Sequence, residues 1–422
     1  MPSLFNAIAR IFDDNRGTSA ALVGIALPVL IGFGALGAET GVWFTIKLQN
    51  QSGADAAAIS AAYEIVAGKT DATSDLTPAA NEEATRNAYK GSTPAVIYPY
   101  SDTIVSNGVA VTLQQTQAAL LAAMFLTEVS VATKAVATVK VFDNPCILAL
   151  GGSGTALHVQ ANTHLDLPNC SAVANSIGAS AVALQDTTSS ITAATLVTAG
   201  EVSMQGNPID PAAPPPEFAL ASPAMIGAPT IADPYAATLT HTFLVAGMAS
   251  APKCKSLDSG HIRGNCKADT WTVRPGKTID LSPGTYWLTG NLTVYGTLQS
   301  QGGVTIILAG GLALASGATI NLVAQSSGPF AGIVLIQDSN GLPAGTVSID
   351  AAAGVTLNGL VYFPKASVTS FHGNPSAAAG PRCLLLVVNT LNVNATSSLD
   401  SAGCASAGLA NLPTVSTVAL AE

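Results

Sequence analysis

The first strong pattern in the chain is an apolar run without a charged residue, from Thr18 to Ala38. A helix rises about 1.5 Å per residue, so this run is roughly 31 Å long and matches the hydrocarbon core of a bilayer. Beyond the run, Ala54, Ala58 and Ile65 recur at the spacing of one helix face. The pattern predicts one long helix that ends near Gly68, with residues 18–38 crossing a membrane.

Two other interpretations of the apolar run are open. A buried core helix is disfavoured by its length and uniformly apolar character. A cleaved signal peptide has small residues available at Ala35-Leu36-Gly37, but signal cores usually span only about 7–15 residues. Arg10 and Arg16 precede the run and Lys47 follows it, so the positive-inside tendency places residues 1–17 in the cytoplasm.

Small residues within this helix point to a contact with another helix. Gly37 and Gly41 form a small-xxx-small pair, which lets two backbones approach closely in a membrane. Pro28 is expected to kink the helix, because proline removes one backbone hydrogen bond. Glu39, at the outer boundary, is expected to be solvated at the interface. Residues 39–78 are then the helix extension and a connection.

Residues 79–142 have a mixed pattern that predicts a small α+β module. Residues 80–89 and 117–126 have helical periodicity, whereas residues 109–113 and 128–141 alternate like strands.

From Cys146 onward the chain consists of short apolar alternations separated by Gly, Asn and Ser, such as Thr278–Leu281, Val304–Leu308 and Thr319–Val323. Recurring short strands without helices between them predict a parallel β-helix-like solenoid, with a β-sandwich as the alternative. The expected parts are first rungs over 143–206, a Pro-rich linker and disulfide-bearing insert over 207–275, and a main region over 276–422. The fold class is therefore mainly β, with an α+β portion and an N-terminal pilin-like helix.

The cysteines and the low charge indicate an exported protein. All six cysteines follow the apolar run, and an even number on the exported side predicts disulfides. Fifteen pairings are possible for six cysteines, and sequence proximity favours Cys146–Cys170, Cys254–Cys266 and Cys383–Cys404. A zinc site is disfavoured, because no C-x-x-C is present and the five histidines, at 158, 164, 241, 261 and 372, lack ligand spacing.

Charge and motifs argue against nucleic-acid binding and against catalysis. The net charge is −9 and only 10% of the residues are charged, with Lys and Arg expected to be scattered rather than clustered. Four carboxylates of the β-rich region are expected to be isolated, solvated turn residues: Asp280, Asp338, Asp350 and Asp400. No phosphate-binding loop, zinc-protease motif or dinucleotide fingerprint occurs. No catalytic residue, cofactor or metal site is therefore predicted.

The N-terminal region resembles a known family. The residues that carry the resemblance are Arg16-Gly17, Leu27-Pro28-Val29-Leu30, Gly41, Trp43, Leu48-Gln49-Asn50 and Ala54-Asp55-Ala56-Ala57-Ala58. In this order they are similar to TadG-like proteins of the TadE/TadG group, which belongs to the tight-adherence (Flp pilus) assembly machinery. Glu39 stands where the family commonly has Asp. No Glu follows Gly17, where Ala21 and Leu22 lie, so the resemblance favours a membrane-retained protein over a processed pilin.

The resemblance implies a non-enzymatic, membrane-anchored assembly component of a tight-adherence pilus. Its implied location is the bacterial inner membrane, with one span, a cytoplasmic N-terminus and a periplasmic or cell-surface bulk. Its implied partners are pilus-assembly or pilin-like proteins bound through the N-terminal helix, in a homo- or hetero-oligomer. The alternatives are a surface adhesin that binds carbohydrate or a host surface, and a β-helical carbohydrate-active enzyme.

Overall fold

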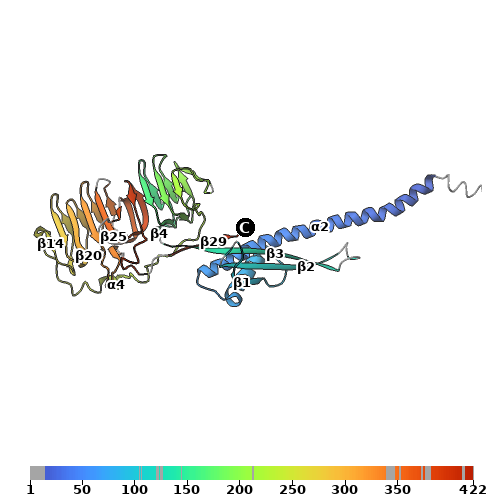
Figure 1. The fold of residues 1–422 in the computed structure, drawn as a ribbon, viewed down its shortest axis with the longest axis horizontal. Helices are drawn as coiled ribbons and strands as arrows, with labels where there is room; N and C mark the ends of the chain where they lie inside the picture. Colours follow the sequence, from blue (N-terminus) through green and yellow to red (C-terminus); the bar gives the residue numbers. More distant parts are fainter. Residues whose placement is uncertain are drawn as a thin grey trace, which may run out of the picture. The chain divides into compact units, whose positions relative to one another are not determined.

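The computed structural model describes residues 15–421, apart from 104, 106, 120–122, 124–126, 144, 212, 339–346, 351–352, 372–373, 376–381 and 411–413. The protein is mostly strand, with one long N-terminal helix, and divides into two compact units (Figure 1). Unit 1 comprises Met1–Lys140 and Ser416–Glu422, and unit 2 comprises Val141–Val415. Unit 2 is thus an insertion in the chain of unit 1.

Unit 1 begins with α2 (Asn15–Val66), one uninterrupted helix of 52 residues. The predicted long helix is confirmed, and it ends where expected. Gly68 follows with φ of 84°, a left-handed conformation that glycine adopts without steric cost and that commonly terminates helices.

The second half of α2 packs through alanines. Ala54, Ala57, Ala58, Ala61 and Ala62 are fully buried. They pack against α3 and the sheet of unit 1, where the neighbouring core residues are Leu76, Ala80, Ala84, Val109, Val111, Leu113, Ala135 and Ala137. Alanine suits this face because it favours helix and lets the backbones approach closely.

The remaining elements of unit 1 are η1 (Ala72–Leu76), α3 (Thr77–Arg86), β1 (Ala95–Tyr100), β2 (Gly108–Ala118), β3 (Glu128–Asp143) and β29 (Thr414–Leu420). The sheet has the order β1-β2-β3-β29, and β2 and β3 form a long antiparallel pair from Gly108↔Thr138 to Ala118↔Glu128. The expected helix over 80–89 exists as α3. The expected helix over 117–126 is wrong at its start, because Gln117 and Ala118 complete β2; most of its other residues lie outside the described part.

Unit 2 is built from short strands that pair in parallel. They are β4 (Pro145–Ala149), β5 (Leu157–Val159), β6 (His164–Leu167), β7 (Ser171–Ala174), β8 (Val182–Leu184), β9 (Ser190–Ala193), β10 (Leu196–Thr198), β11 (Val202–Met204), β12 (Asn207–Pro208), β13 (Phe218–Leu220), β14 (His261–Ile262), β15 (Cys266–Ala268), β16 (Trp271–Val273), β17 (Thr278–Leu281), β18 (Gly284–Leu288), β19 (Leu292–Val294), β20 (Thr297–Leu308), β21 (Leu312–Leu314), β22 (Thr319–Val323), β23 (Ile333–Gln337), β24 (Val347–Ile349), β25 (Gly354–Phe371), β26 (Asn374–Pro375), β27 (Leu384–Val393) and β28 (Ser397–Ser398). Two short helical turns, α4 (His241–Val245) and η2 (Leu257–Ser259), complete it.

The strands form three ladders of parallel pairs. The first ladder runs β14-β17-β20-β22-β25-β26. The second runs β15-β18-β20-β23-β25-β27-β4-β7-β10. The third runs β16-β19-β21-β24-β25-β27-β5-β8-β11. A smaller parallel sheet contains β28, β6, β9 and β13.

The third ladder carries a continuous column of buried apolar side chains. In order of pairing they are Trp271, Leu292, Leu312, Val347, Val368, Leu391, Leu157, Val182 and Val202. Each side chain therefore stacks on the one before it. The strand period of two is visible in β16, where exposed Thr272 lies between buried Trp271 and Val273.

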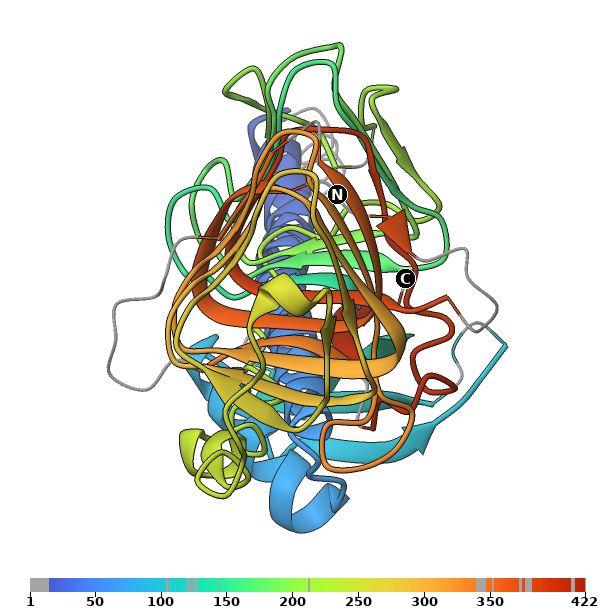
Figure 2. The same ribbon diagram turned by 90° about the vertical axis from the view of Figure 1, so that its left-hand side faces the viewer.

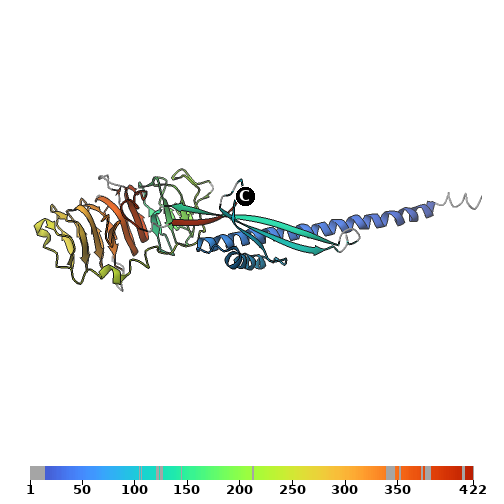
Figure 3. The same cartoon turned by 60° about the horizontal axis from the view of Figure 1, so that its bottom comes forward.

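The order of the ladders differs from the order of the chain. The strand pairings Leu386↔Ile147 and Leu391↔Leu157 place the last ladder strand, β27, against the first ones, β4 and β5. The chain thus enters the stack in its middle, builds to the β10–β11 end, crosses to the β14–β16 end, and builds back to the middle. Figures 1 and 3 show this succession, with β14, β20, β25 and β4 following one another along unit 2.

Residues 207–260, which we call the crossing segment, make that return. The Pro-rich interruption is therefore the connection between the two ends of the stack. The ladder strands resume at His261, earlier than the expected 276, so residues 261–273 form the terminal rung rather than part of the insert. In the end view of Figure 2 this rung and the adjoining crossing segment, both yellow, lie foremost.

The crossing segment covers the outer face of the second ladder. Tyr235, Leu239 and Leu244 form a buried cluster with ladder residues that include Trp287 and Leu360. The Trp287 Nε1–H donates a hydrogen bond of 2.8 Å to the carbonyl oxygen of Leu244. The second ladder is consequently buried on both faces.

Candidate functional site

The first half of α2 exposes apolar side chains. Leu30, Ile31, Phe33 and Phe44 are exposed, Phe33 to 71%. Over Val29–Val66, the helix is long and apolar enough to cross a membrane. Exposed apolar side chains on successive turns cost free energy in water but not in lipid, which makes this half of the helix a candidate membrane anchor.

The predicted helix-packing residues lie on this open part of the helix. A Cβ added at Gly37 or Gly41 would meet no atom within 4 Å. Pro28 lies within the continuous helix. The contact of these three residues with another helix remains a prediction. Glu39 is only 6% exposed, so the expectation that it is solvated is wrong.

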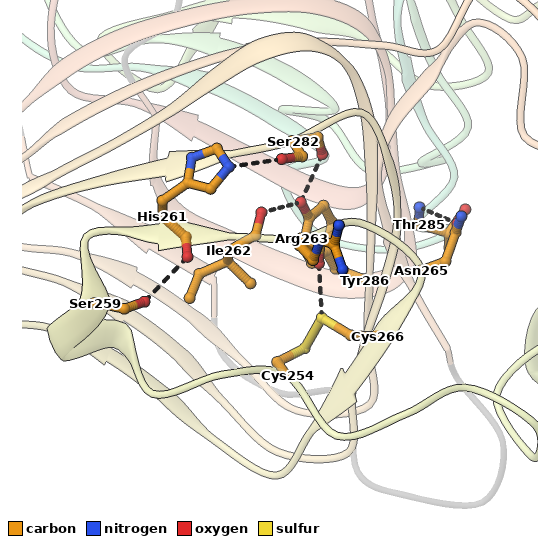
Figure 4. The surroundings of a disulfide bond; sticks show 10 residues. All are labelled: Cys254, Ser259, His261, Ile262, Arg263, Asn265, Cys266, Ser282, Thr285 and Tyr286. Carbon is orange, nitrogen blue, oxygen red and sulfur yellow. Dashed lines mark hydrogen bonds between the residues drawn. A yellow bond between two sulfur atoms is a disulfide. The ribbon is translucent and has the colours of Figure 1, made fainter.

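The six predicted cysteines form three disulfides, in the pairing that proximity favours. Cys146–Cys170 joins the strands around β4 and β7, and Cys383–Cys404 fastens the residue before β27 to the chain beyond β28. Cys254–Cys266 joins the crossing segment to β15 of the terminal rung (Figure 4). Each disulfide therefore joins two segments of unit 2 that are close in sequence.

A polar pocket of about 450 Å³ lies where the crossing segment meets the second ladder. His241 Nδ1 lies 2.7 Å from Oδ2 of Asp338, the residue after β23. The Tyr362 hydroxyl, on β25, donates a hydrogen bond of 2.6 Å to Oδ2 of Asp233. Lys365 also lines the pocket. No spacing in the sequence signals this grouping, because Asp338 is remote in sequence from His241 and Asp233.

The tyrosines in this region are held in their protonated form. Burial raises the pKa of Tyr362, and its hydrogen bond to Asp233 and the charge of that carboxylate raise it further. Burial, with a smaller contribution from Asp233, also raises the pKa of Tyr235, whose ring contacts that of Tyr362 edge-on at 5.8 Å. The Tyr362 hydroxyl is therefore a hydrogen-bond donor that ties the crossing segment to β25.

The expectation of solvated turn residues is wrong for three of the four carboxylates, because Asp338 and Asp400 are buried and Asp280 lies within β17. Those outside this pocket have local surroundings of their own. Asp280 accepts a hydrogen bond of 2.6 Å from the Gln299 amide on the neighbouring strand. Asp400 accepts one of 2.9 Å from the backbone N–H of Ala402. Asp350 follows β24. Among the described residues, no group of three His, Cys, Asp or Glu is placed to hold a metal ion, and His372 lies outside that part of the chain.

No protein family, no curated protein and no solved structure matches this chain.

Proposed function

We propose that this protein is a membrane-anchored, non-enzymatic structural component whose β-rich region contacts other envelope proteins. The observation that carries the proposal is the division of α2. Its first half exposes apolar side chains such as Leu30 and Phe33, whereas its second half is packed in unit 1 through alanines. A rigid continuous helix would connect an anchor in the bilayer directly to a folded unit outside it.

We further propose that unit 2 is a parallel β-helical solenoid. Three parallel ladders and a continuous apolar column support this architecture, since a solenoid stacks equivalent strands and buries an inward row of side chains. A β-sandwich, the alternative, would pair its strands in antiparallel order, and parallel pairs predominate in the three ladders.

The sequence likeness of residues 16–58 to TadG-like proteins supports the assignment to a tight-adherence pilus system. On this proposal the protein is a single-span inner-membrane protein with a cytoplasmic N-terminus, and unit 2 lies in the periplasm or at the cell surface. Gly37 and Gly41 then face a partner helix of another assembly protein or of a second copy.

The anchor is tested by placing charges in the apolar half of α2. In the full-length chain, Leu30→Arg with Phe33→Arg should move the protein from the membrane fraction to the soluble fraction. Each buried arginine costs about 2.5–3.5 kcal/mol at the centre of a spanning helix. The matched control, Leu30→Ala with Phe33→Ala, keeps the helix uncharged and should remain in the membrane.

Carbonate extraction and fractionation of cells measure the outcome, and mass spectrometry of the N-terminus reports on processing. An intact N-terminus in the inner membrane supports a retained assembly component. Cleavage after Gly17, with the protein in sheared filaments, would replace the proposal with a processed pilin-like subunit. A soluble wild-type protein would refute the anchor itself.

A further inference from the structure

The cations of unit 2 are concentrated in one short stretch of sequence. Residues 253–277 contain six Lys and Arg and two Asp, whereas the rest of residues 141–415 contains two Lys and Arg and eleven Asp and Glu. The expectation that basic residues are scattered is therefore wrong for this stretch. The six cations are Lys253, Lys255, Arg263, Lys267, Arg274 and Lys277.

The fold gathers this stretch at one end of the stack. Residues 261–273 form the terminal rung, and Cys254–Cys266 fixes the preceding crossing segment to it (Figure 4). Five of the six cations are exposed, and Lys267 is the exception. Its Nζ donates hydrogen bonds of 3.1 Å to the carbonyl oxygens of Met248 and Ala249, which gives it a structural role.

The exposed cations border two pockets that share Lys255. A pocket of about 340 Å³ lies between the crossing segment and β16, and it is lined by Lys255, Arg274 and Lys277. The hydroxyl side chains of Ser256, Thr270 and Thr272 line the same pocket. The second pocket, of about 490 Å³, is lined by Lys253, Lys255 and Arg263. Both sizes fall in the range of ligand sites.

The cations of the first pocket have little internal neutralisation. Arg274 Nη1 lies 3.9 Å from Oδ1 of Asp258, and both side chains are more than two-thirds exposed. Among the described residues, neither Lys255 nor Lys277 has an ion pair within 4.0 Å. Asp258 also lines this pocket, so three cations face one carboxylate there and the pocket keeps a net positive charge. A positively charged pocket in an otherwise acidic unit attracts anions from solution.

We propose that residues 253–277, the terminal rung with the chain on either side of it, bind an anionic polysaccharide, with the ammonium and guanidinium groups of Lys255, Arg274 and Lys277 contacting the carboxylates of a uronate chain. The hydroxyl groups of the pocket would exchange hydrogen bonds with sugar hydroxyls. This inference rests on the charges and pockets of unit 2 and does not depend on the membrane anchor or on the pilus assignment.

Other anionic partners fit this end less well. A membrane surface calls for several apolar side chains that insert into lipid. Residues 253–277 include no exposed large hydrophobic side chain, and the neighbouring chain adds one exposed ring, that of Tyr295. Single-stranded nucleic acids stack successive bases on several aromatic rings, whereas Trp271 is buried and Tyr295 is the one exposed aromatic side chain among residues 253–295. The three disulfides also indicate an oxidising compartment, where envelope polysaccharides occur and cytoplasmic nucleic acid does not.

The test uses the full-length protein in detergent and labelled polygalacturonate as the probe. The variant Lys255→Gln/Arg274→Gln/Lys277→Gln should bind the probe at least tenfold more weakly. The matched control, Lys69→Gln/Arg86→Gln/Lys90→Gln, removes three cations from unit 1 and should bind as wild type does. Wild-type binding should also weaken steeply between about 50 mM and about 300 mM NaCl. The slope of log K against log salt concentration should be smaller by roughly two in the triple variant, because binding with fewer cationic contacts releases fewer counterions.

Equal losses in the two triple variants would refute the proposal, as would binding of neutral dextran as tight as that of polygalacturonate. Tighter binding to single-stranded DNA or to anionic vesicles would assign the surface to a different partner. If the variant Lys255→Gln/Arg274→Gln/Lys277→Gln self-associates and still binds the probe as wild type does, the proposal is refuted. The charges would then serve to keep the unpaired edge of β16 from pairing with another chain. Should the triple variant fail to fold, the single variant Lys277→Glu carries the test: it should weaken binding severalfold, and unchanged binding would refute the proposal.

Discussion

Unit 1 and unit 2 bury their apolar side chains in different ways. In unit 1, one helix presents alanines such as Ala58 and Ala61 to a sheet whose strands β1, β2 and β3 follow one another in sequence. In unit 2, the buried column of the third ladder is assembled from strands on both sides of the crossing segment, and Leu391 stacks on Leu157. All six cysteines lie in unit 2, in three bonds with sequence separations of 24, 12 and 21. The cross-links therefore close short loops within unit 2, and the contacts between strands far apart in sequence are held by packing and by strand pairing.

The largest difference in stability between the units should follow from a cavity where β27 pairs with β4 and β5. Leu391→Ala removes a side chain that is 2% exposed and that stacks between Val368 and Leu157. We expect a loss of about 2–5 kcal/mol of stability confined to unit 2. Hydrogen exchange measured by mass spectrometry should show lower protection in unit 2 peptides and unchanged protection in unit 1. The control Ile177→Ala, at a residue 73% exposed, should change neither.

Loss of one disulfide should have the next largest effect. The variant Cys383→Ser/Cys404→Ser opens a loop with a sequence separation of 21 and should lower stability by roughly 2–4 kcal/mol. In thermal melts, reductant should lower the wild-type transition of unit 2 and leave that of unit 1 in place. A transition of unit 1 that moves equally with reductant would show that the two units unfold together.

Overpacking the alanine face should affect unit 1 alone. Ala58→Leu adds bulk where the side chain is fully buried, and we expect a loss of about 1–3 kcal/mol. Tyr63→Leu, at an exposed position of the same helix, is the control and should have little effect. Hydrogen exchange of β2 and β3 peptides measures the result, and unchanged exchange in the Ala58 variant would contradict the observed packing.

The smallest effects should come from two aspartates, one in each unit: Asp71 is exposed and Asp186 is half-buried. Backbone N–H groups of Ser74 and Thr73 lower the pKa of Asp71, and the Thr188 hydroxyl and N–H lower that of Asp186. A lowered folded-state pKa stabilises the protein above the unfolded value, and this contribution disappears as pH falls through the folded value. Asp71→Asn and Asp186→Asn should therefore lower Tm slightly at pH 7 and not at all at strongly acidic pH. If the Tm difference between wild type and variant grows as the pH falls, the prediction is contradicted.

Several features of the molecule were predictable because they depend on local periodicity. The apolar run and the alanine spacing near Ala54 predicted α2, since a helix places every third or fourth residue on one face. Short alternations such as Thr319–Val323 predicted strands, since successive side chains of a strand point to opposite faces. By contrast, Gln117 and Ala118 extend a strand despite a helical pattern, because pairing with β3 outweighs weak local preference.

The candidate sites were less accessible to sequence reasoning. The six cations of 253–277 are visible in the sequence, but their meeting around two pockets requires the terminal rung. The pair of His241 and Asp338 depends on the path of the crossing segment and has no signal in spacing. Contacts between residues so far apart are set by packing rather than by neighbouring residues.

The sequence by itself determined the long helix, the repeated short strands and the six cysteines available for disulfides. Only the tertiary structure decided the order of the stack, with β27 against β4 and the Pro-rich crossing segment returning the chain from one end to the other. The physical reason is that alternation specifies which side of a strand is buried, whereas many aliphatic strands of similar length offer equivalent edges. The partner of each strand is selected when the whole column is packed.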